Sequence, residues 1–320
     1  MKKKMVVMLA SSMTALLMMI ALLVNGCDPT PTPTGMTKKK ITVSRGTFSY
    51  REGGSATGTA VVMVHGWPES SYCWEGVAAK MTSTLRIIAP DLRGLGDSER
   101  TMNNLQAYQK VELAKDIVAI LDALKIDSFY LVGHDWGGVV AQEVALAVPS
   151  RVKKLAILNM PIILNLQNNM AARDIIYSKG AVPFWYQYFQ QQENLPEAMI
   201  PGNEDVWVPH FFKNRPVPQA SINEYIRCYS ITNTAATGAS YYRTMSDDGQ
   251  RWYSLATAGT KFSMPGLYIY GNLDTVIIRD YLTGIENYFP SLQVKEIEAA
   301  HFVQEEKPAD VAQLLNDFFK

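Results

Sequence analysis

Cysteine is scarce in this sequence, with three residues in 320, at positions 27, 73 and 228. Two cysteines in the body of a chain this long do not make a disulfide framework, and without a Cys-x-x-Cys pair they do not indicate a metal site. One bridge between Cys73 and Cys228 stays open as an alternative to two unpaired thiols.

An excess of either charge is also absent, since Lys plus Arg and Asp plus Glu each number 30. This balance excludes the basic surface of a nucleic-acid-binding protein. The sequence has no glycine-rich phosphate loop and no internal repeat.

The first 27 residues differ in composition from the rest. Three lysines at positions 2–4 precede an apolar run over residues 5–24, and Asn25-Gly26-Cys27 follows. This is the layout of a secretory signal, residues 1–27, and its Gly-Cys end resembles a bacterial lipoprotein signal in which Cys27 is lipidated. An uncleaved membrane anchor is the alternative. Residues 28–40, rich in Pro, Thr and Lys, predict an extended linker. We therefore expect an exported protein, either tethered to a membrane as a periplasmic or cell-surface lipoprotein or secreted.

From residue 41 onward, apolar runs of strand length alternate with stretches of helical periodicity. This alternation predicts a mostly parallel sheet with helices on both faces. Residues 162–255 interrupt it, because they are rich in Gln, Asn, Tyr and Trp and look helical without strands between. We predict an α/β core at 41–161 and 256–320, with eight strands and a helical cap (162–255) inserted after the sixth. The predicted strands are 41–44, 47–52, 60–66, 85–90, 128–134, 152–159, 266–272 and 294–300, and the core helices are 106–125, 137–148 and 308–319.

The stretch Gly-His-Asp-Trp-Gly-Gly, residues 133–138, has the form of a nucleophile elbow with Asp135 at its centre. A predicted strand precedes it and a predicted helix follows it, as this motif requires. Glycines flank the turn because it is tight, and the nucleophile projects from it. The alternative without a catalytic role is that Asp135 is a turn residue that caps the following helix.

An elbow nucleophile requires an acid and then a histidine further along the chain. Asp274 follows the strand predicted at 266–272, and His301 is the histidine that follows a late strand near the C-terminus. His134 should point away from the nucleophile by strand alternation, and His210 lies in the cap. The backbone N–H groups of Trp67, in the loop after the strand at 60–66, and of Trp136 are expected to bind a developing oxyanion.

Five segments occur in this order: HGWPESSYCW, APDLRGLGDSE, GHDWGG, GNLD and AAHF. With these segments the chain resembles the epoxide hydrolases of the α/β-hydrolase fold over nearly everything after residue 41. Haloalkane and haloacetate dehalogenases are close relatives that share the aspartate nucleophile. The resemblance implies hydrolysis of a small-molecule epoxide to a vicinal diol with water, without metal or cofactor. The sequence leaves the oligomeric state open.

An aspartate nucleophile suits attack on a saturated carbon, because it leaves an ester on the protein. Water activated by His301, which Asp274 orients, then attacks the Asp135 carbonyl group. A serine would instead leave an ether that this water could not hydrolyse. The resemblance also implies two cap residues that donate protons to the epoxide oxygen. Tyr242 matches one of them. For the other, an alignment without gaps places Trp185 at the donor position with Tyr186 beside it, and both stay candidates.

Two other functions remain open. A dehalogenase would use the same nucleophile, but haloalkane enzymes usually carry an Asn where this chain has Trp67. Fluoroacetate enzymes carry an Arg where it has Trp136. The third hypothesis, a tethered binding protein with an inactive site, fits poorly with the complete set of Asp135, Asp274 and His301.

Overall fold

The computed structural model describes residues 35–180 and 182–320. Within them, eight strands form one sheet in the order β1-β2-β4-β3-β5-β6-β7-β8. β2 runs antiparallel to both of its neighbours, and the pairs from β4 through β8 are parallel. The predicted fold class is therefore confirmed. The strands are β1 (Thr37–Val43), β2 (Gly46–Gly54), β3 (Thr59–Val64), β4 (Leu85–Pro90), β5 (Phe129–His134), β6 (Val152–Leu158), β7 (Gly266–Gly271) and β8 (Leu292–Ile297).

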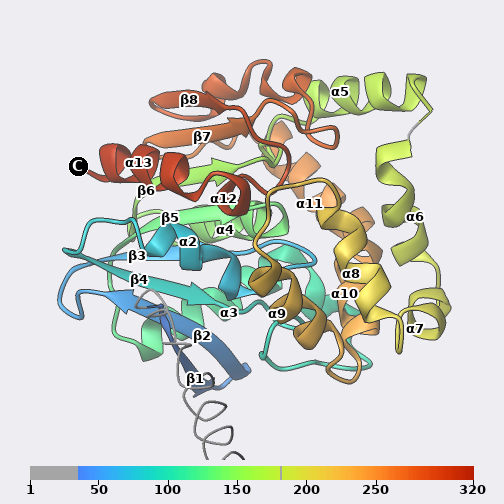
Figure 1. The fold of residues 1–320 in the computed structure, drawn as a ribbon. Helices are drawn as coiled ribbons and strands as arrows, with labels where there is room; N and C mark the ends of the chain where they lie inside the picture. Colours follow the sequence, from blue (N-terminus) through green and yellow to red (C-terminus); the bar gives the residue numbers. More distant parts are fainter. Residues whose placement is uncertain (1–34, 181) are drawn as a thin grey trace, which may run out of the picture. The chain divides into compact units, whose positions relative to one another are not determined.

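The helices fall into a core set and a cap set. The core helices are α2 (Glu75–Ala78), α3 (Lys110–Ala123), α4 (Trp136–Ala147), α12 (Val303–Glu306) and α13 (Pro308–Phe319). The cap helices lie between β6 and β7 in the chain, and in Figure 1 α5 to α8 stand to the right of the sheet. They are α5 (Leu166–Ser178), α6 (Trp185–Gln191), α7 (Leu195–Met199), α8 (Glu204–Phe212), α9 (Gln219–Tyr229), α10 (Thr234–Arg243) and α11 (Met245–Thr257). The exact domain boundaries stay a prediction.

The start of the sheet differs from the prediction. β1 begins at Thr37, so residues 37–40 belong to a strand although they lie inside the predicted 28–40 linker. The sequence shows no strand signal here, because three consecutive lysines at positions 38–40 have no alternation of apolar and polar residues. β1 is an edge strand that pairs only with β2, and lysines are common on exposed edges, where they discourage pairing with another chain.

The central strands carry the core and bring the loops of the site to one edge of the sheet. β7 is buried along its whole length, and β3 is buried from its second residue onward. Such continuous apolar strands are typical of a parallel sheet covered on both faces. The register pairs Gly133 with Ile157 and Leu158 with Ile269, so the carboxyl ends of β5, β6 and β7 lie side by side. Loops that follow these ends meet at this edge.

Cys73 and Cys228 are both buried and not paired with each other. The disulfide alternative is therefore wrong. Burial raises the pKa of the Cys73 thiol well above its ordinary value, and raises that of Cys228 to about 12, so neither thiol is reactive near neutral pH.

Candidate active site

Asp135 lies in a strained turn between β5 and α4. Its backbone has φ 51° and ψ −129°, a region that residues with a side chain seldom adopt. The glycines on either side of this turn, Gly133 and Gly137, have no room for a side chain. A Cβ on Gly133 would lie 2.3 Å from the carbonyl oxygen of Gly137, and one on Gly137 would lie 2.3 Å from that of His65. The residues GHDWGG thus form a tight, strained turn between β5 and α4.

One carboxylate oxygen of Asp135 is held by backbone, and the other faces the histidine. Oδ1 accepts a hydrogen bond of 2.8 Å from the Trp67 N–H, and Oδ2 lies 3.5 Å from His301 Nε2. Burial alone would raise the pKa of Asp135, but the hydrogen bond and charge of His301, together with the Trp136 N–H, outweigh it and hold that pKa below its ordinary value. Asp135 is therefore a carboxylate at neutral pH.

His301 forms a buried pair with Asp274. Its Nδ1 lies 2.7 Å from Asp274 Oδ2, which fixes the ring so that Nε2 points at Asp135. Burial would lower the pKa of His301, but the negative charges of Asp274 and Asp135 raise it to about 10. Burial would likewise raise the pKa of Asp274, but the His301 charge and the hydrogen bonds to the carboxylate lower it. With both carboxylates ionised, His301 is an imidazolium.

Asn159, which the sequence analysis did not single out, braces this pair. It follows β6 with φ 40°. Its Nδ2 donates to Asp274 Oδ2 at 2.7 Å and to the Ala300 carbonyl oxygen at 3.2 Å, while its Oδ1 accepts from the Gly271 N–H at 2.7 Å. One side chain therefore joins the loops after β6, β7 and β8. No sequence motif marks such a residue.

The His134 side chain points away from the Asp135 carboxylate, as strand alternation predicts, and contacts the backbone of His301. Its Nε2 lies 2.8 Å from the His301 carbonyl oxygen and therefore carries a proton, because a carbonyl oxygen only accepts. Its Nδ1 lies 3.1 Å from both Glu69 Oε2 and Gln304 Nε2. This buried polar layer fixes the backbone of the loop that carries His301.

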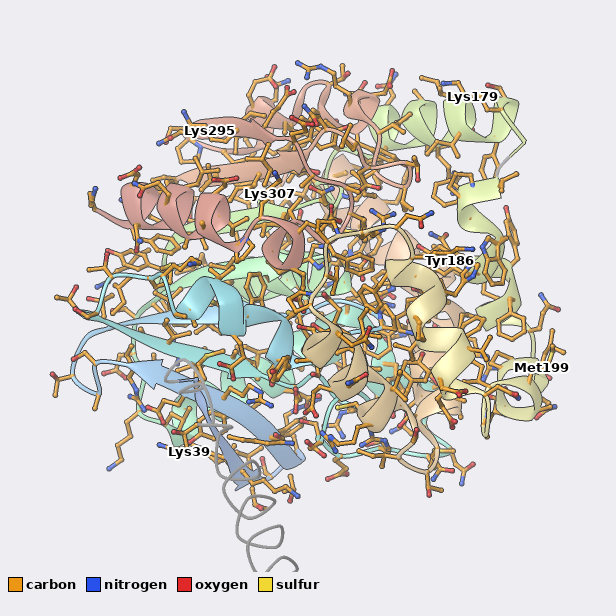
Figure 2. The ribbon with its side chains drawn as sticks, in the orientation of Figure 1. Lys39, Lys179, Tyr186, Met199, Lys295 and Lys307 are labelled. Atoms are coloured by element: carbon orange, nitrogen blue, oxygen red, sulfur yellow. The ribbon has the colours of Figure 1, made fainter. Side chains whose placement is uncertain are left out.

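A cavity of about 260 Å³ opens above Asp135, and its walls are mostly apolar. Tyr242 and Tyr186 both line it, the first from α10 and the second from α6, where Figure 2 labels it. The Tyr242 ring packs edge-on against Trp67, Trp136 and Tyr186 at centroid distances of 5.5, 5.4 and 5.8 Å. Burial raises the pKa of both phenols, so both keep their protons at neutral pH.

Trp185 does not join them. Its side chain is 42% exposed and is not among the residues that line the cavity. The indole instead packs against Trp207, His210 and Phe211 of α8. The structure thus separates the two adjacent candidates, with Tyr186 facing the cavity and Trp185 facing outward.

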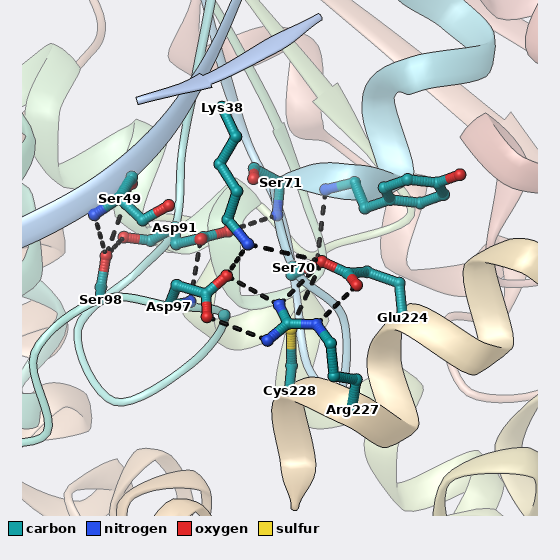
Figure 3. Close-up of polar contacts among 12 residues, drawn as sticks. Lys38, Ser49, Ser70, Ser71, Asp91, Asp97, Ser98, Glu224, Arg227 and Cys228 are labelled. Carbon is teal, nitrogen blue, oxygen red and sulfur yellow. Dashed lines mark hydrogen bonds and ion pairs between the residues drawn. The ribbon is translucent and has the colours of Figure 1, made fainter. Parts of the chain in front are cut away.

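A second polar cluster lies away from the cavity, where α9 meets β1 and the loop after β4 (Figure 3). Asp97, Glu224 and Cys228 bring three potential metal ligands within 4.8 Å of one another. Lys38 forms an ion pair with Asp97. Arg227 pairs with Asp97 and with Glu224, both at 2.7 Å. Because cations already neutralise both carboxylates, we assign no metal to this cluster. It connects the cap to the N-terminal hairpin.

Comparison with known proteins assigns the chain to one fold family. A family profile described as alpha/beta hydrolase fold matches residues 59–308. The chain belongs to the α/β-hydrolase fold family. The match begins at β3, spans the cap and ends just after His301, so it includes Asp135, Asp274 and His301.

Several relatives of this α/β-hydrolase are named epoxide hydrolases, which confirms the predicted resemblance. The chain is 27% identical over 324 residues to bifunctional epoxide hydrolase 2 of Sus scrofa, covering 92% of this chain and 56% of the relative. It is 28% identical over 285 residues to the soluble epoxide hydrolase of Corynebacterium sp. (strain C12), covering 83% and 91%. Among solved structures, epoxide hydrolase VrEH1 from Vigna radiata has 25% identity and a TM-score of 0.76, covering 90% of this chain and 99% of that one. The chain spans about half the length of the Sus scrofa relative.

The prediction of an exported, membrane-tethered protein is contradicted by these relatives, one of which is named a soluble epoxide hydrolase. That prediction depended on the composition of 27 residues alone, whereas the relatives match most of the chain. The predicted signal and Cys27 lie outside the described residues. Among residues 35–180 and 182–320, the structure contains no helix with the length and apolar character to cross a membrane.

Proposed function

We propose that this chain hydrolyses an epoxide to a vicinal diol through an ester formed on Asp135. The observation that carries the proposal is the combination of side chains that line the cavity. A carboxylate nucleophile lies at its base, and two protonated phenols, Tyr186 and Tyr242, line the same space. An epoxide requires both, because its ring opens by attack on carbon and leaves an alkoxide that must be protonated. The names of the relatives support the same reaction.

In the first step, Oδ2 of Asp135 attacks a ring carbon. Oδ1 stays on the Trp67 N–H, 2.8 Å away, which leaves Oδ2 as the reacting oxygen. The ring carbon–oxygen bond breaks as the new ester bond forms, and a proton from Tyr242 or Tyr186 passes to the departing oxygen. The mostly apolar walls of the cavity shield the reacting groups from bulk water.

In the second step, His301 becomes a base because its surroundings change. The carboxylate charge of Asp135 helps to raise the pKa of His301 in the free enzyme, and formation of the ester removes that charge. The imidazolium then loses a proton, which restores the phenol, and the neutral ring takes a proton from water. This water attacks the Asp135 carbonyl carbon. The N–H groups of Trp67 and Trp136 hold the oxyanion. The bond between the carbonyl carbon and the substrate oxygen then breaks, and that oxygen takes the remaining proton of the attacking water, so the diol leaves as the carboxylate re-forms.

A dehalogenase is the weaker alternative, because a departing halide needs no proton and leaves the paired phenols unexplained. Turnover of epoxides and of matched haloalkanes, measured side by side with the same protein, tests the proposal. We expect diol from at least one epoxide and no halide release. Halide release without diol would contradict the proposal, and absence of both reactions would favour the inactive binding protein.

A further inference from the structure

Lys110 is a fully buried cation at the joint between core and cap. It is the first residue of α3, and its side chain is 0% exposed. The three N–H donors of its ammonium group all bind cap residues: the carbonyl oxygen of Tyr241, Thr244 Oγ1 at 2.8 Å and Asp248 Oδ2 at 2.9 Å. An ammonium has three donors and no acceptor, so its hydrogen bonding is complete.

Asp248 completes the joint from the cap. Its Oδ2 pairs with the Lys110 ammonium, and its Oδ1 accepts from the backbone N–H of Lys110 at 2.9 Å. The carboxylate thus satisfies an N–H at the start of α3 that the helix itself leaves without a partner. The core helix α3 and the first turn of the cap helix α11 are therefore fixed to each other by one buried ion pair.

The same ammonium contacts the active site on its other side. It lies 4.2 Å from the centroid of the Trp136 indole, in cation–π contact. The Trp136 ring packs edge-on against Tyr242 at 5.4 Å, and the Trp136 backbone follows the nucleophile directly. Tyr242 is also the neighbour of Tyr241, whose carbonyl Lys110 binds. Lys110 thus holds both the backbone that carries Tyr242 and the indole against which the Tyr242 ring rests.

We infer that Lys110 is a positioning residue for epoxide opening, which sets the Tyr242 phenol over Asp135. This inference rests on the proposed function. Buried ion pairs add little net stability compared with apolar residues of the same volume. The Lys110–Asp248 pair instead fixes positions. The three hydrogen bonds of the ammonium hold the end of α10, the residue after it and the start of α11, and its charge holds the Trp136 indole against Tyr242.

A double-mutant cycle on the rate of Asp135 alkylation tests the inference. Lys110→Met with Asp248→Asn removes both charges, keeps similar volumes and leaves an amide oxygen to accept the N–H of residue 110. Thr244→Val is the second variant in case the pair fails to fold, because it removes one of the three acceptors of the ammonium and leaves the two charges paired. We expect it to have a smaller effect of the same sign. The control is Lys115→Met, the same substitution on the same helix, where the side chain is 53% exposed. Its alkylation rate should not change.

We expect the double variant to slow alkylation by about 10-fold or more when Tyr242 is present, the size of effect that a misplaced catalytic group produces. In a Tyr242→Phe background the same two substitutions should lower the alkylation rate by less than about 2-fold, because the hydroxyl group that Lys110 positions is already absent. Equal losses in both backgrounds, or no loss in either, would overturn the inference.

A crystal structure of the double variant keeps the inference separate from the proposed function. We expect the Tyr242 and Trp136 rings to shift relative to Asp135. Unchanged rings would overturn the inference whatever the enzyme turns over. Failure of the wild-type protein to form an adduct with any epoxide would instead refute the proposed function.

Discussion

Replacing Tyr242 with Phe removes one hydroxyl group and leaves the ring contacts with Trp67, Trp136 and Tyr186 in place. The proton donor should therefore be lost without a change in packing. Loss of a general acid costs about 10²–10⁴-fold in rate. Because Tyr186 lines the same cavity and can still donate, we expect the lower end, about 100-fold in kcat/KM. This loss corresponds to about 2.7 kcal/mol of activation free energy.

The assay is the initial rate of diol formation, together with thermal unfolding of each variant. Tyr241→Phe is the matched control, because it removes a hydroxyl one residue away that donates to the Arg93 carbonyl oxygen at 2.7 Å. It should cost about 1–3 kcal/mol of stability, since a buried acceptor loses its partner, with little change in rate. If Tyr242→Phe instead lowers stability and leaves kcat/KM within 3-fold of wild type, the assignment of Tyr242 as a donor is refuted.

The remaining predictions concern the second proton donor, the pH dependence of stability and the hydrogen bond from Asn159 to Asp274. Tyr186→Phe should slow diol formation by about 10-fold or more, whereas Trp185→Phe should leave it nearly unchanged; the reverse order would reassign the donor. The raised folded pKa of His301, about 10 against an ordinary 6.5, means that its contribution to stability is complete below about pH 6.5 and is lost as pH rises towards 10. Urea unfolding should accordingly show wild type losing more stability between pH 7 and pH 9.5 than His301→Gln, and equal losses would contradict the pairing. Asn159→Ala leaves Asp274 without one of its donors, so ester hydrolysis should slow by about 10-fold while alkylation is retained, as stopped-flow measurement of the two steps would reveal.

Elements with strong periodicity were predictable from sequence, and those defined by distant contacts were not. The predicted helix at 308–319 coincides with α13, because its apolar residues repeat at helical spacing and Pro308 marks its start. The first four residues of β1, 37–40, escaped prediction because their lysines lie on an open edge, where no packing imposes a pattern.

The active site divides in the same way. The order of Asp135, Asp274 and His301 along the chain is a property of the motif, so sequence alone could propose the set. Trp185 and Tyr186 are adjacent on a helix, where neighbouring side chains point about 100° apart, so an alignment uncertain by one residue cannot decide which faces the cavity. Asn159 and Lys110 bind partners more than 100 residues away, at Asp274 and Asp248, and nothing local marks them.

The most direct test of the central claim, a covalent ester on Asp135, is a single turnover in water labelled with heavy oxygen. We predict that the label enters the Asp135 carboxylate and not the first diol, because the diol oxygen comes from the protein. In His301→Gln the ester should accumulate, and the protein mass should increase by that of one substrate. Label in the diol after the first turnover, with no adduct on the His301→Gln protein, would contradict the account.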